Sequence, residues 1–356
     1  MPLLHQMRSR LPAHVHYART RHWPEPGEAR NGVLLMSGID WQRAATELVR
    51  ELRGARTQKA LSRALGYRSN VVFSWESGRD VPSIGTLGEL LVKVGRDPRA
   101  WLSDFARGDV PDTLDCAADW AKYATTLNKG RSLKELAHVL GQSRYVVSRW
   151  LSGKTAIPLP EFLRFVDITT LSALDLVALL VSPASLPTIA PHYARLEAAR
   201  RSAQEKPWSH AIVHMVELPS YRALPAHEPG WFASRLQIGI REEAQCLDLL
   251  VQMGRLTFEG GRYQSTGSLA VDTQPDPDAT RRLASFWMHE GAERVLVTGS
   301  GRYAFNAFGI AKKDLERLGD LQRKYFAELR AIVADSPRTE AVAVATFQLF
   351  HLAREP

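Results

Sequence analysis

This chain contains the stretch Lys59-x-Leu61-x3-Leu65-Gly66-x4-Val71-Val72-x2-Trp75-x-Ser77-Gly78-Arg79, and 75 residues later it contains Lys134-x-Leu136-x3-Leu140-Gly141-x4-Val146-Val147-x2-Trp150-x-Ser152-Gly153-Lys154. The offset is constant, and nine of the 21 positions in this window are identical. A repeat of this period is too long for a solenoid unit and suits a small duplicated domain. Each copy reads as a helix, a tight glycine turn and a second helix.

Positive charge is concentrated in the two copies. Each copy carries five Lys or Arg residues and one Glu, which gives a net +4, whereas the whole chain carries +8. The basic residues are Arg56, Lys59, Arg63, Arg68 and Arg79 in the first copy, and Arg131, Lys134, Arg144, Arg149 and Lys154 in the second. Localised positive charge is typical of surfaces that bind nucleic-acid phosphates.

The second helix of each copy has one constant and one variable face. If Val72 and Trp75 face the core, helical geometry at about 100° per residue puts a different set of side chains outward. That set is Asn70, Phe73, Ser74 and Ser77 in the first copy, and Tyr145, Ser148, Arg149 and Ser152 in the second. Small polar residues and Arg at such positions hydrogen-bond base edges in the major groove. Phe73 and Tyr145 either touch bases or are partly buried against a neighbouring helix.

Further residues flank these helices where phosphates would pass. They are Gln58, Arg68, Arg79, Arg144 and Lys154, and Gln58 also begins a helix whose N–H groups point outward. Ser69 and Ser143 begin the two outward-facing helices. These seven residues, with the variable face except Ser152, are the predicted DNA-binding set.

Local signals predict five helices in each copy. Asp40, Thr57 and Ser132 are typical N-cap residues, and Gly66 and Gly141 mark the turns. The first copy is predicted to form helices at 41–53, 57–65, 69–77, 82–94 and 97–105. The second is predicted to form helices at 115–126, from 132 to the turn at 141, at 143–152, and two more within 160–181.

The region after residue 206 has a different pattern. Predicted helices at 208–218, 231–236 and 242–253 precede two short strands, 256–259 and 262–265, around Gly260-Gly261. That order is typical of a winged helix. A helix at 280–295, a strand at 303–310, a helix at 313–333 and a closing strand at 341–352 complete a predicted α+β domain. Arg241-Glu242-Glu243 would repel phosphates at the start of the candidate recognition helix, so a protein contact is favoured there.

Several classes of protein are disfavoured by the rest of the sequence. Cys116 and Cys246 lack CxxC spacing, so we expect neither a disulfide nor a zinc site. The glycines of 298–301 lack the spacing of a nucleotide loop, and His289-Glu290 lacks a second metal-binding histidine. We therefore expect no enzyme activity, no cofactor and no metal. No apolar run is long enough for a membrane helix and no signal peptide is evident, which favours a cytoplasmic protein.

A family resemblance follows from these residues. The run Thr57-Gln58-Lys59-Ala60-Leu61-Ser62-Arg63-Ala64-Leu65-Gly66, with Val72, Trp75-Glu76-Ser77-Gly78-Arg79 and Pro82-Ser83, resembles the Cro/repressor-type (XRE-like) helix-turn-helix family. The resemblance covers residues 40–182 and implies base contacts from Ser69, Asn70, Phe73 and Ser74, and a phosphate contact from Gln58. The second copy departs from the pattern, with Leu151 at the position of Glu76 and Pro158 shifted by one residue relative to Pro82. The C-terminal part resembles a bacterial domain of unknown function found behind helix-turn-helix segments.

The sequence thus predicts a mainly α protein: two tandem five-helix helix-turn-helix domains followed by a winged-helix-like α+β domain. The predicted segments are a basic leader (1–36), the two helix-turn-helix domains (37–108 and 109–182), a linker (183–206) and a C-terminal domain for dimerisation or sensing (207–356). The leader is either an arm that reaches DNA or an extension ahead of a true start at Met36.

The expected function is sequence-specific regulation of transcription. The chain would read two half-sites on double-stranded DNA about 34 Å apart, as a built-in pseudo-dimer. We also expect a homodimer, and a protein, peptide or small-molecule effector at the C-terminal domain. The alternative is an antitoxin or defence-system factor whose C-terminal domain binds a partner protein and whose DNA binding is autoregulatory. A DNA-targeted enzyme is the third hypothesis.

Overall fold

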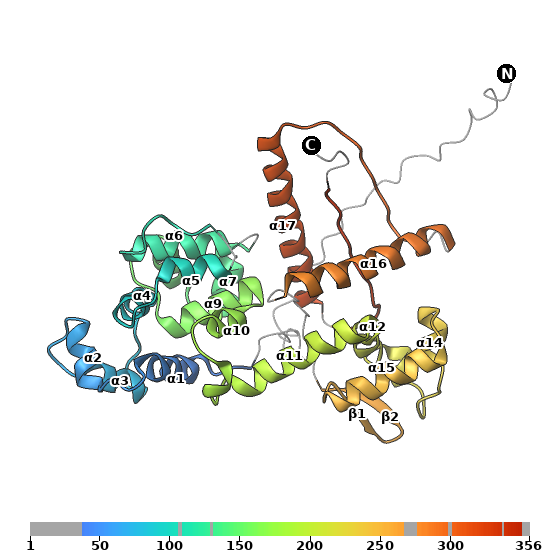
Figure 1. Ribbon diagram of the computed structural model, residues 1–356, viewed down its shortest axis with the longest axis horizontal. Coiled ribbons are helices and arrows are strands. Elements are labelled where there is room, and N and C mark those ends of the chain that lie inside the picture. Colours follow the sequence, from blue (N-terminus) through green and yellow to red (C-terminus); the bar gives the residue numbers. More distant parts are fainter. Residues whose placement is uncertain are drawn as a thin grey trace.

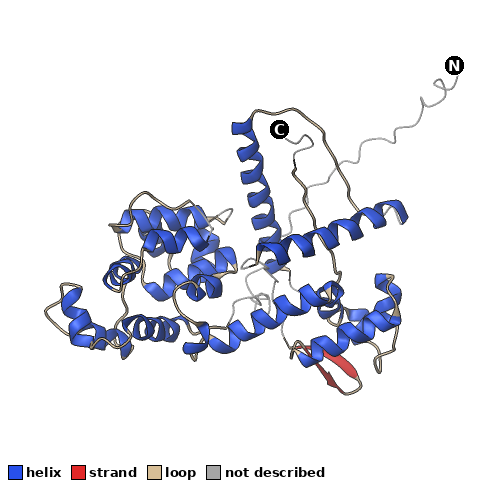
Figure 2. Cartoon of the chain, viewed as in Figure 1, coloured by secondary structure: helices blue, strands red, loops and turns tan. Residues whose placement is uncertain are grey.

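The computed structural model describes residues 38–105, 109–128, 131–266, 276–297, 301–336 and 338–350. Over these residues the chain is mainly helical and has one two-stranded sheet (Figure 1; Figure 2). The leader predicted for residues 1–36 lies outside the described residues. No helix in the described part is both long and apolar enough to cross a lipid bilayer.

The two copies form helices close to the predicted positions. The first copy contains α1 (Trp41–Arg53), α2 (Gln58–Ala64), α3 (Val71–Glu76), α4 (Ile84–Lys93) and α5 (Pro98–Phe105), and the second contains α6 (Ala117–Leu127), α7 (Leu133–Leu140), α8 (Arg144–Leu151), α9 (Leu159–Thr170) and α10 (Ala173–Ala178). The side chains of Asp40, Thr57 and Ser132 accept N-cap hydrogen bonds, as predicted. Gly66 (φ 85°) and Gly141 (φ 65°) adopt the left-handed conformation that their turns require.

The two copies share one hydrophobic core. A single buried cluster takes side chains from each of the helices α1 to α10, including Leu48, Val72, Leu91, Val147 and Phe162. Across the copies, α1 contacts α9, α4 contacts both α6 and α9, and α5 contacts α10 (Figure 1). Helices of one copy thus complete the apolar surface of the other, and the two copies pack as one unit.

A short backbone bridge joins the copies. The Ile84 N–H donates to the carbonyl oxygen of Ile157, and the Leu159 N–H donates to that of Pro82, both at 2.9 Å. Ser83 and Pro158 are the bridged pair between these two bonds. The main-chain nitrogen of the residue at the centre of the bridge donates no hydrogen bond, so proline is tolerated at position 158. Pro158 corresponds to Ser83 of the first copy, one position after Pro82.

The predicted linker, residues 183–206, is mostly helical. It contains a 3-10 turn (Pro183–Ser185) and α11 (Ala190–Glu205). Pro191 lies in the first turn of α11, where proline fits because its missing N–H has no helical partner to lose. Figure 1 shows α11 extending from the repeat helices to the C-terminal domain.

Polar contacts attach α11 and its approach to both copies. The Glu47 carboxylate on α1 accepts hydrogen bonds from the N–H of Thr188 (2.9 Å) and from its hydroxyl (2.7 Å). Arg200, on α11, forms a two-pronged pair with Asp175 of α10 at 2.9 and 2.8 Å. Both contacts involve a buried side chain, Glu47 in one and Arg200 in the other. Removing Glu47 would leave the Thr188 donors without this acceptor, and removing Asp175 would do the same to Arg200.

The C-terminal domain has its own buried cluster, which includes Trp208, Tyr221, Phe232 and Leu250. It is built from α12 (Pro207–Met215), α13 (Pro219–Arg222), α14 (Trp231–Leu236), α15 (Ile240–Gln252), β1 (Leu256–Glu259) and β2 (Arg262–Ser265). The two strands pair antiparallel, from Leu256 opposite Ser265 to Glu259 opposite Arg262. Gly260 and Gly261 both have positive φ, as a two-residue hairpin turn requires, so the predicted hairpin is confirmed.

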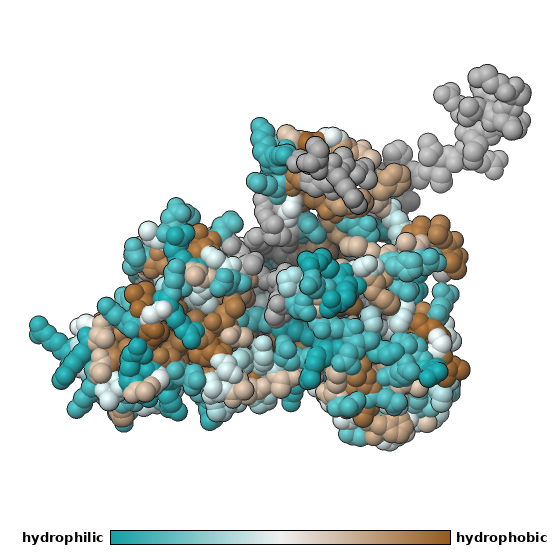
Figure 3. Space-filling model, viewed as in Figure 1, coloured by the Kyte–Doolittle hydropathy of each residue, from teal (hydrophilic) through white to brown (hydrophobic). Residues whose placement is uncertain are grey.

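Two long helices, α16 (Pro277–Val297) and α17 (Lys312–Asp335), follow the hairpin. The prediction of a strand at 303–310 is wrong, because these residues form no strand. Residues 341–350 of the strand predicted at 341–352 also form no strand, and residues 351–352 lie outside the described part of the chain. An apolar run forms a strand only beside a partner strand, and within the described residues these two segments pair with none. The predicted α+β domain therefore reduces to helices and one hairpin. Many apolar side chains here are exposed, including Phe305 at 94%, and Figure 3 shows a hydrophobic patch at the end of α16.

Candidate nucleic-acid interface

The helix α3 separates a buried face from an exposed one. Val72 and Trp75 are buried in the shared core. Ser69, Phe73 and Ser77 are exposed, and Asn70 and Ser74 are half-buried. In the second copy, Val147 and Trp150 are likewise buried, while the exposed or half-buried residues are Ser143, Arg144, Tyr145, Ser148, Arg149 and Ser152. The predicted division of each helix into an inner and an outer face therefore matches the structure.

Each outer face carries one arginine beside one aromatic ring. The Arg79 guanidinium lies 5.3 Å from the centre of the Phe73 ring, and that of Arg149 lies 5.6 Å from the centre of the Tyr145 ring. Tyr145 is 70% exposed and Phe73 43% exposed, so the alternative of burial against a neighbouring helix does not hold for Tyr145. These pairs combine a flat apolar surface with a positive charge, which suits contact with stacked bases and phosphate.

Four cations surround these faces. Arg68 and Arg79 flank α3, whereas Arg144 is the first residue of α8 and Lys154 follows that helix. All four are exposed, and within the described ranges none of them forms an ion pair. Exposed cations without an acidic partner can approach an anionic backbone without first breaking an ion pair inside the protein.

Gln58 has a structural role that sequence reasoning missed. Its side-chain Nε2 donates to Glu76 at 2.7 Å, and Glu76 is buried. The same carboxylate accepts from Arg53 Nε at 2.5 Å, and the Glu76 carbonyl accepts from Arg50 at 3.0 Å. The Gln58 side chain is therefore already engaged, and of the groups predicted to contact phosphate only its main-chain N–H remains. Glu76 lies four residues after Val72, on the core side of α3, and that spacing is the signal that could have revealed the network.

The second copy replaces this network with apolar residues. Leu133 and Leu151 occupy the positions of Gln58 and Glu76. At the start of α7, the Glu135 carboxylate instead accepts from the Ser132 N–H at 2.6 Å, and this hydrogen bond lowers the pKa of Glu135. A carboxylate thus occupies the N-terminal turn of α7, so this helix end is less suited to phosphate than that of α2.

Asn70 is also partly engaged, since its Oδ1 accepts from the Ser62 hydroxyl at 3.2 Å. The Ser62 hydroxyl in turn accepts from the N–H of Val72. The amide nitrogen of Asn70 remains the group that could donate to a base edge, because its oxygen is held inward.

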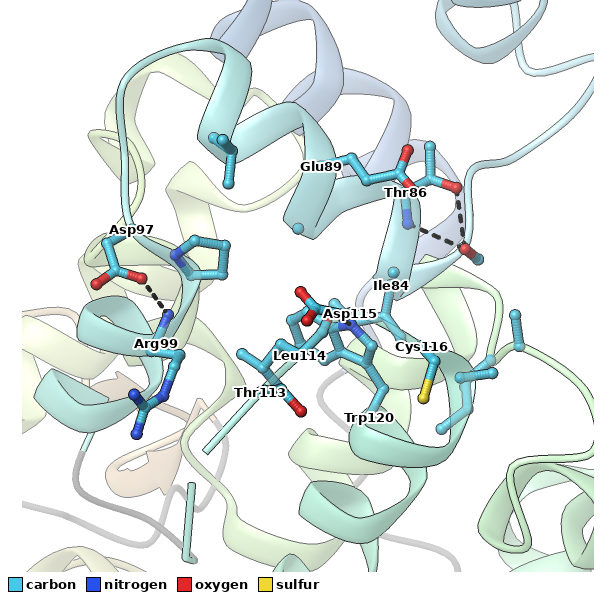
Figure 4. A pocket seen from close by; sticks show the side chains of 18 of the residues that line it. Ile84, Thr86, Glu89, Asp97, Arg99, Thr113, Leu114, Asp115, Cys116 and Trp120 are labelled. Carbon is cyan, nitrogen blue, oxygen red and sulfur yellow. Dashed lines mark hydrogen bonds between the residues drawn. The ribbon is translucent and has the colours of Figure 1, made fainter. Parts of the chain in front are cut away.

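A cavity of about 590 Å³ lies at the junction of the copies (Figure 4). Its wall combines α4 with Trp120 of α6, and it includes Ser83 and Ile157 of the bridge. A Cβ atom at Gly88 would lie 2.8 Å from the Trp120 ring, so only glycine allows this approach. The lining holds the carboxylates Glu89, Asp97, Asp112 and Asp115 and no residue of α3 or α8. Its negative charge sets it apart from the basic faces.

The carboxylates at the start of α15 do not act as predicted. Glu243 is buried and accepts from the N–H groups of Gly230 and Ala233, so it stabilises the start of α14. Glu242 is paired with Lys206 at 3.1 Å. Neither carboxylate is a free exposed charge, so the argument that this helix repels phosphates is much weaker than the sequence suggested.

Three basic side chains gather beside α12. His210 and His214 lie on α12, with ring centres 5.3 Å apart, and Arg255 follows α15. Arg255 is only 3% exposed, and its Nη2 has no hydrogen-bond partner among the described residues. Burial, with the neighbouring positive charges, lowers the pKa of His210 to about 4 and also lowers that of His214.

This cluster predicts acid sensitivity. Because the folded-state pKa of His210 lies below its ordinary value of 6.5, its stabilising contribution is complete above pH 6.5 and falls as the pH drops towards 4. Between pH 7 and pH 5 we expect a loss of about 2 kcal/mol in the free energy of unfolding from His210. Urea denaturation at both pH values measures it. His210→Gln should show a smaller pH dependence, whereas His138→Gln, at an exposed site on α7, should behave like the wild type.

Comparison with known families identifies only the C-terminal part. No helix-turn-helix family model matches the two copies. No curated protein and no solved structure matches the chain. Residues 193–352 match the family model described as a domain of unknown function, DUF4423. The match begins inside α11 and extends over the hairpin and the two long helices. The chain therefore carries a C-terminal DUF4423 domain.

Proposed function

We propose that the chain is a sequence-specific DNA-binding regulator of transcription, in which two tandem helix-turn-helix modules enter the major groove. One observation carries the proposal: α3 and α8 hold their apolar residues in a shared core and turn outward the faces on which the two copies differ. A duplicated reader retains its packing residues and changes its contact residues. The DUF4423 domain would then supply dimerisation or bind an effector.

The outer faces contain the groups that base reading needs. Arg149 offers a guanidinium that can donate two hydrogen bonds to guanine, and the Asn70 amide nitrogen can donate to a base edge. Arg68, Arg79, Arg144 and Lys154 would neutralise phosphates on either side. The half-buried Ser74 and the exposed Ser77 and Ser148 are small enough to let the helix backbone approach the groove floor.

Substitution on the outer face tests the proposal. Arg149→Ala should lower affinity for the preferred duplex by about 2 kcal/mol, because a bidentate base contact is lost, and should leave the fold intact. Lys154→Ala should weaken binding to all duplexes alike and reduce the salt dependence by about one counterion. Fluorescence anisotropy on duplexes selected from a random library, at several salt concentrations, measures both effects. Lys313→Ala, at an exposed site on α17, is the matched control. Unchanged affinity in Arg149→Ala would contradict the proposed role of α8.

The second candidate function is that of a partner-binding factor with autoregulatory DNA binding, such as an antitoxin. The exposed apolar residues of the C-terminal part favour it, among them Leu296 and Phe305. Contiguous exposed apolar surface commonly marks a protein interface. If this surface binds a second chain or a partner protein, the double variant Leu296→Ser and Phe305→Ser should reduce the mass of the assembly measured by light scattering. The affinity of one chain for DNA should not change. A variant with unchanged mass and biological function would exclude this role.

A further inference from the structure

The two copies are related by a local twofold axis. The bridge bonds run from Ile84 to Ile157 and from Leu159 to Pro82. At the repeat offset of 75 residues, the donor Ile84 corresponds to the donor Leu159, and the acceptor Ile157 corresponds to the acceptor Pro82. Exchanging the two copies therefore converts each hydrogen bond into the other. Ser83 and Pro158, which occupy one repeat position, face each other between these bonds. Reciprocal contacts of this kind arise from a twofold rotation and not from a translation.

A second contact lies on the same axis. The Trp101 indole N–H donates to the carbonyl of Leu176 at 2.9 Å, and these residues are again 75 apart. The helix contacts agree, because α4 lies against its equivalent α9, and α5 against its equivalent α10. The contact of α1 with α9 has its mate in that of α4 with α6. The reciprocal bridge bonds and these contacts between equivalent helices point to the same twofold relation.

Side-chain volumes differ across the axis in a compensating way. On one side Gly88 of α4 accommodates the Trp120 ring of α6. At the equivalent positions, α9 has Leu163 in place of Gly88 and α1 has Ala45 in place of Trp120. Leu163 and Ala45 are both buried. A large residue and a small one thus occupy the two equivalent pairs of positions, with the large one on opposite helices. The interface is self-complementary in shape although its two halves have diverged in sequence.

We infer that the DNA site is an inverted repeat of two unequal half-sites read by a single chain, an inference that rests on the proposed function. When α3 and α8 enter one duplex together, as the proposed function requires, a twofold relation between the copies presents them in opposite senses, so their half-sites are inverted and not direct repeats. The half-sites differ because equivalent outer positions differ: Asn70 corresponds to Tyr145, Phe73 to Ser148 and Ser74 to Arg149. A single fixed spacing is expected, because the copies share one core.

Selection of bound duplexes from a random library by the full chain tests the inference. The expected motif has two different halves in inverted orientation at one spacing. On the selected site, reversing one half to make a direct repeat should weaken binding about 100-fold, as deleting that half does, because only one module is then engaged. Equal affinity for the direct repeat, or a motif with one half only, would overturn the inference and leave duplex binding established. Failure to enrich any duplex would overturn the proposed function itself.

A substitution set makes the test sharper. Asn70→Tyr, Phe73→Ser and Ser74→Arg together give the first copy the outer residues of the second. This variant should select a more symmetric inverted repeat, in which the half-site read by α3 changes towards that read by α8. The reverse set, Tyr145→Asn, Ser148→Phe and Arg149→Ser, should change the other half instead. If either set altered both halves equally, or neither half, the assignment of one half-site to each copy would be wrong; circular dichroism verifies that both variants fold.

Discussion

Replacing Glu76 with alanine is expected to lower the free energy of unfolding by about 3 kcal/mol. The buried carboxylate accepts hydrogen bonds from Arg53 and Gln58, and its removal leaves a partly buried guanidinium and an amide without an acceptor. An unpaired buried donor costs more than the intact pair contributes, so the loss exceeds that of an ordinary surface ion pair. Urea denaturation at neutral pH measures the change.

The second copy provides the control for this experiment. There, Asn128, Leu133 and Leu151 occupy the positions of Arg53, Gln58 and Glu76. Changing all three residues of the first copy to these types should be less destabilising than Glu76→Ala alone, since the Arg53 guanidinium and the Gln58 amide are then removed together with their acceptor and neither is left unsatisfied. Glu89→Ala, at an exposed site on α4, should change stability by no more than about 0.5 kcal/mol. A triple variant less stable than Glu76→Ala would contradict this account.

Gly153→Ala should be far more damaging than the equivalent Gly78→Ala. Both glycines have φ near 70°, so alanine at either site incurs a conformational cost of about 1 kcal/mol. At Gly153 the added Cβ would also lie 2.6 Å from the Cα of Ala118, whereas at Gly78 it meets nothing within 4 Å. Backbone atoms cannot move aside as a flexible side chain can, so we expect a total loss of about 3 kcal/mol for Gly153→Ala.

Thermal unfolding of the two glycine variants in parallel isolates the steric part, because the backbone strain is common to both. Gly66→Ala and Gly141→Ala are further controls, since neither added Cβ meets any atom within 4 Å. These two should resemble Gly78→Ala. Equal melting temperatures for Gly153→Ala and Gly78→Ala would show that the N-terminus of α6 can shift, contrary to its place in the shared core.

Features fixed by local chemistry could be predicted from the sequence. N-caps at Thr57 and Ser132 and left-handed turns at Gly66 and Gly141 each depend on one or two residues. The hairpin at Gly260-Gly261 was predicted with its strand bounds because the turn type requires two residues with positive φ. The buried and exposed faces of α3 and α8 followed from helical periodicity alone.

Features that depend on distant contacts could not be predicted. The pattern of apolar residues predicts which side chains are buried but not which copy they pack against. The shared core and the twofold relation between the copies were therefore not predicted. The strands predicted at 303–310 and 341–352 are apolar segments, and an apolar segment forms a strand only where a neighbouring strand pairs with it. At the candidate site, the charge and exposure of Arg79 and Arg149 were predictable, whereas the engagement of Gln58 with Glu76 depends on how α2 and α3 pack together.

The attachment of α11 has a mechanical consequence for signalling. Thr188 is held by Glu47 of the first copy, and Arg200 by Asp175 of the second. The helix that leads into the DUF4423 domain is thus fastened on both sides of the pseudo-symmetric pair. If the C-terminal domain binds an effector, as proposed, a rotation of α11 would either tilt the two copies together or break one of these two contacts.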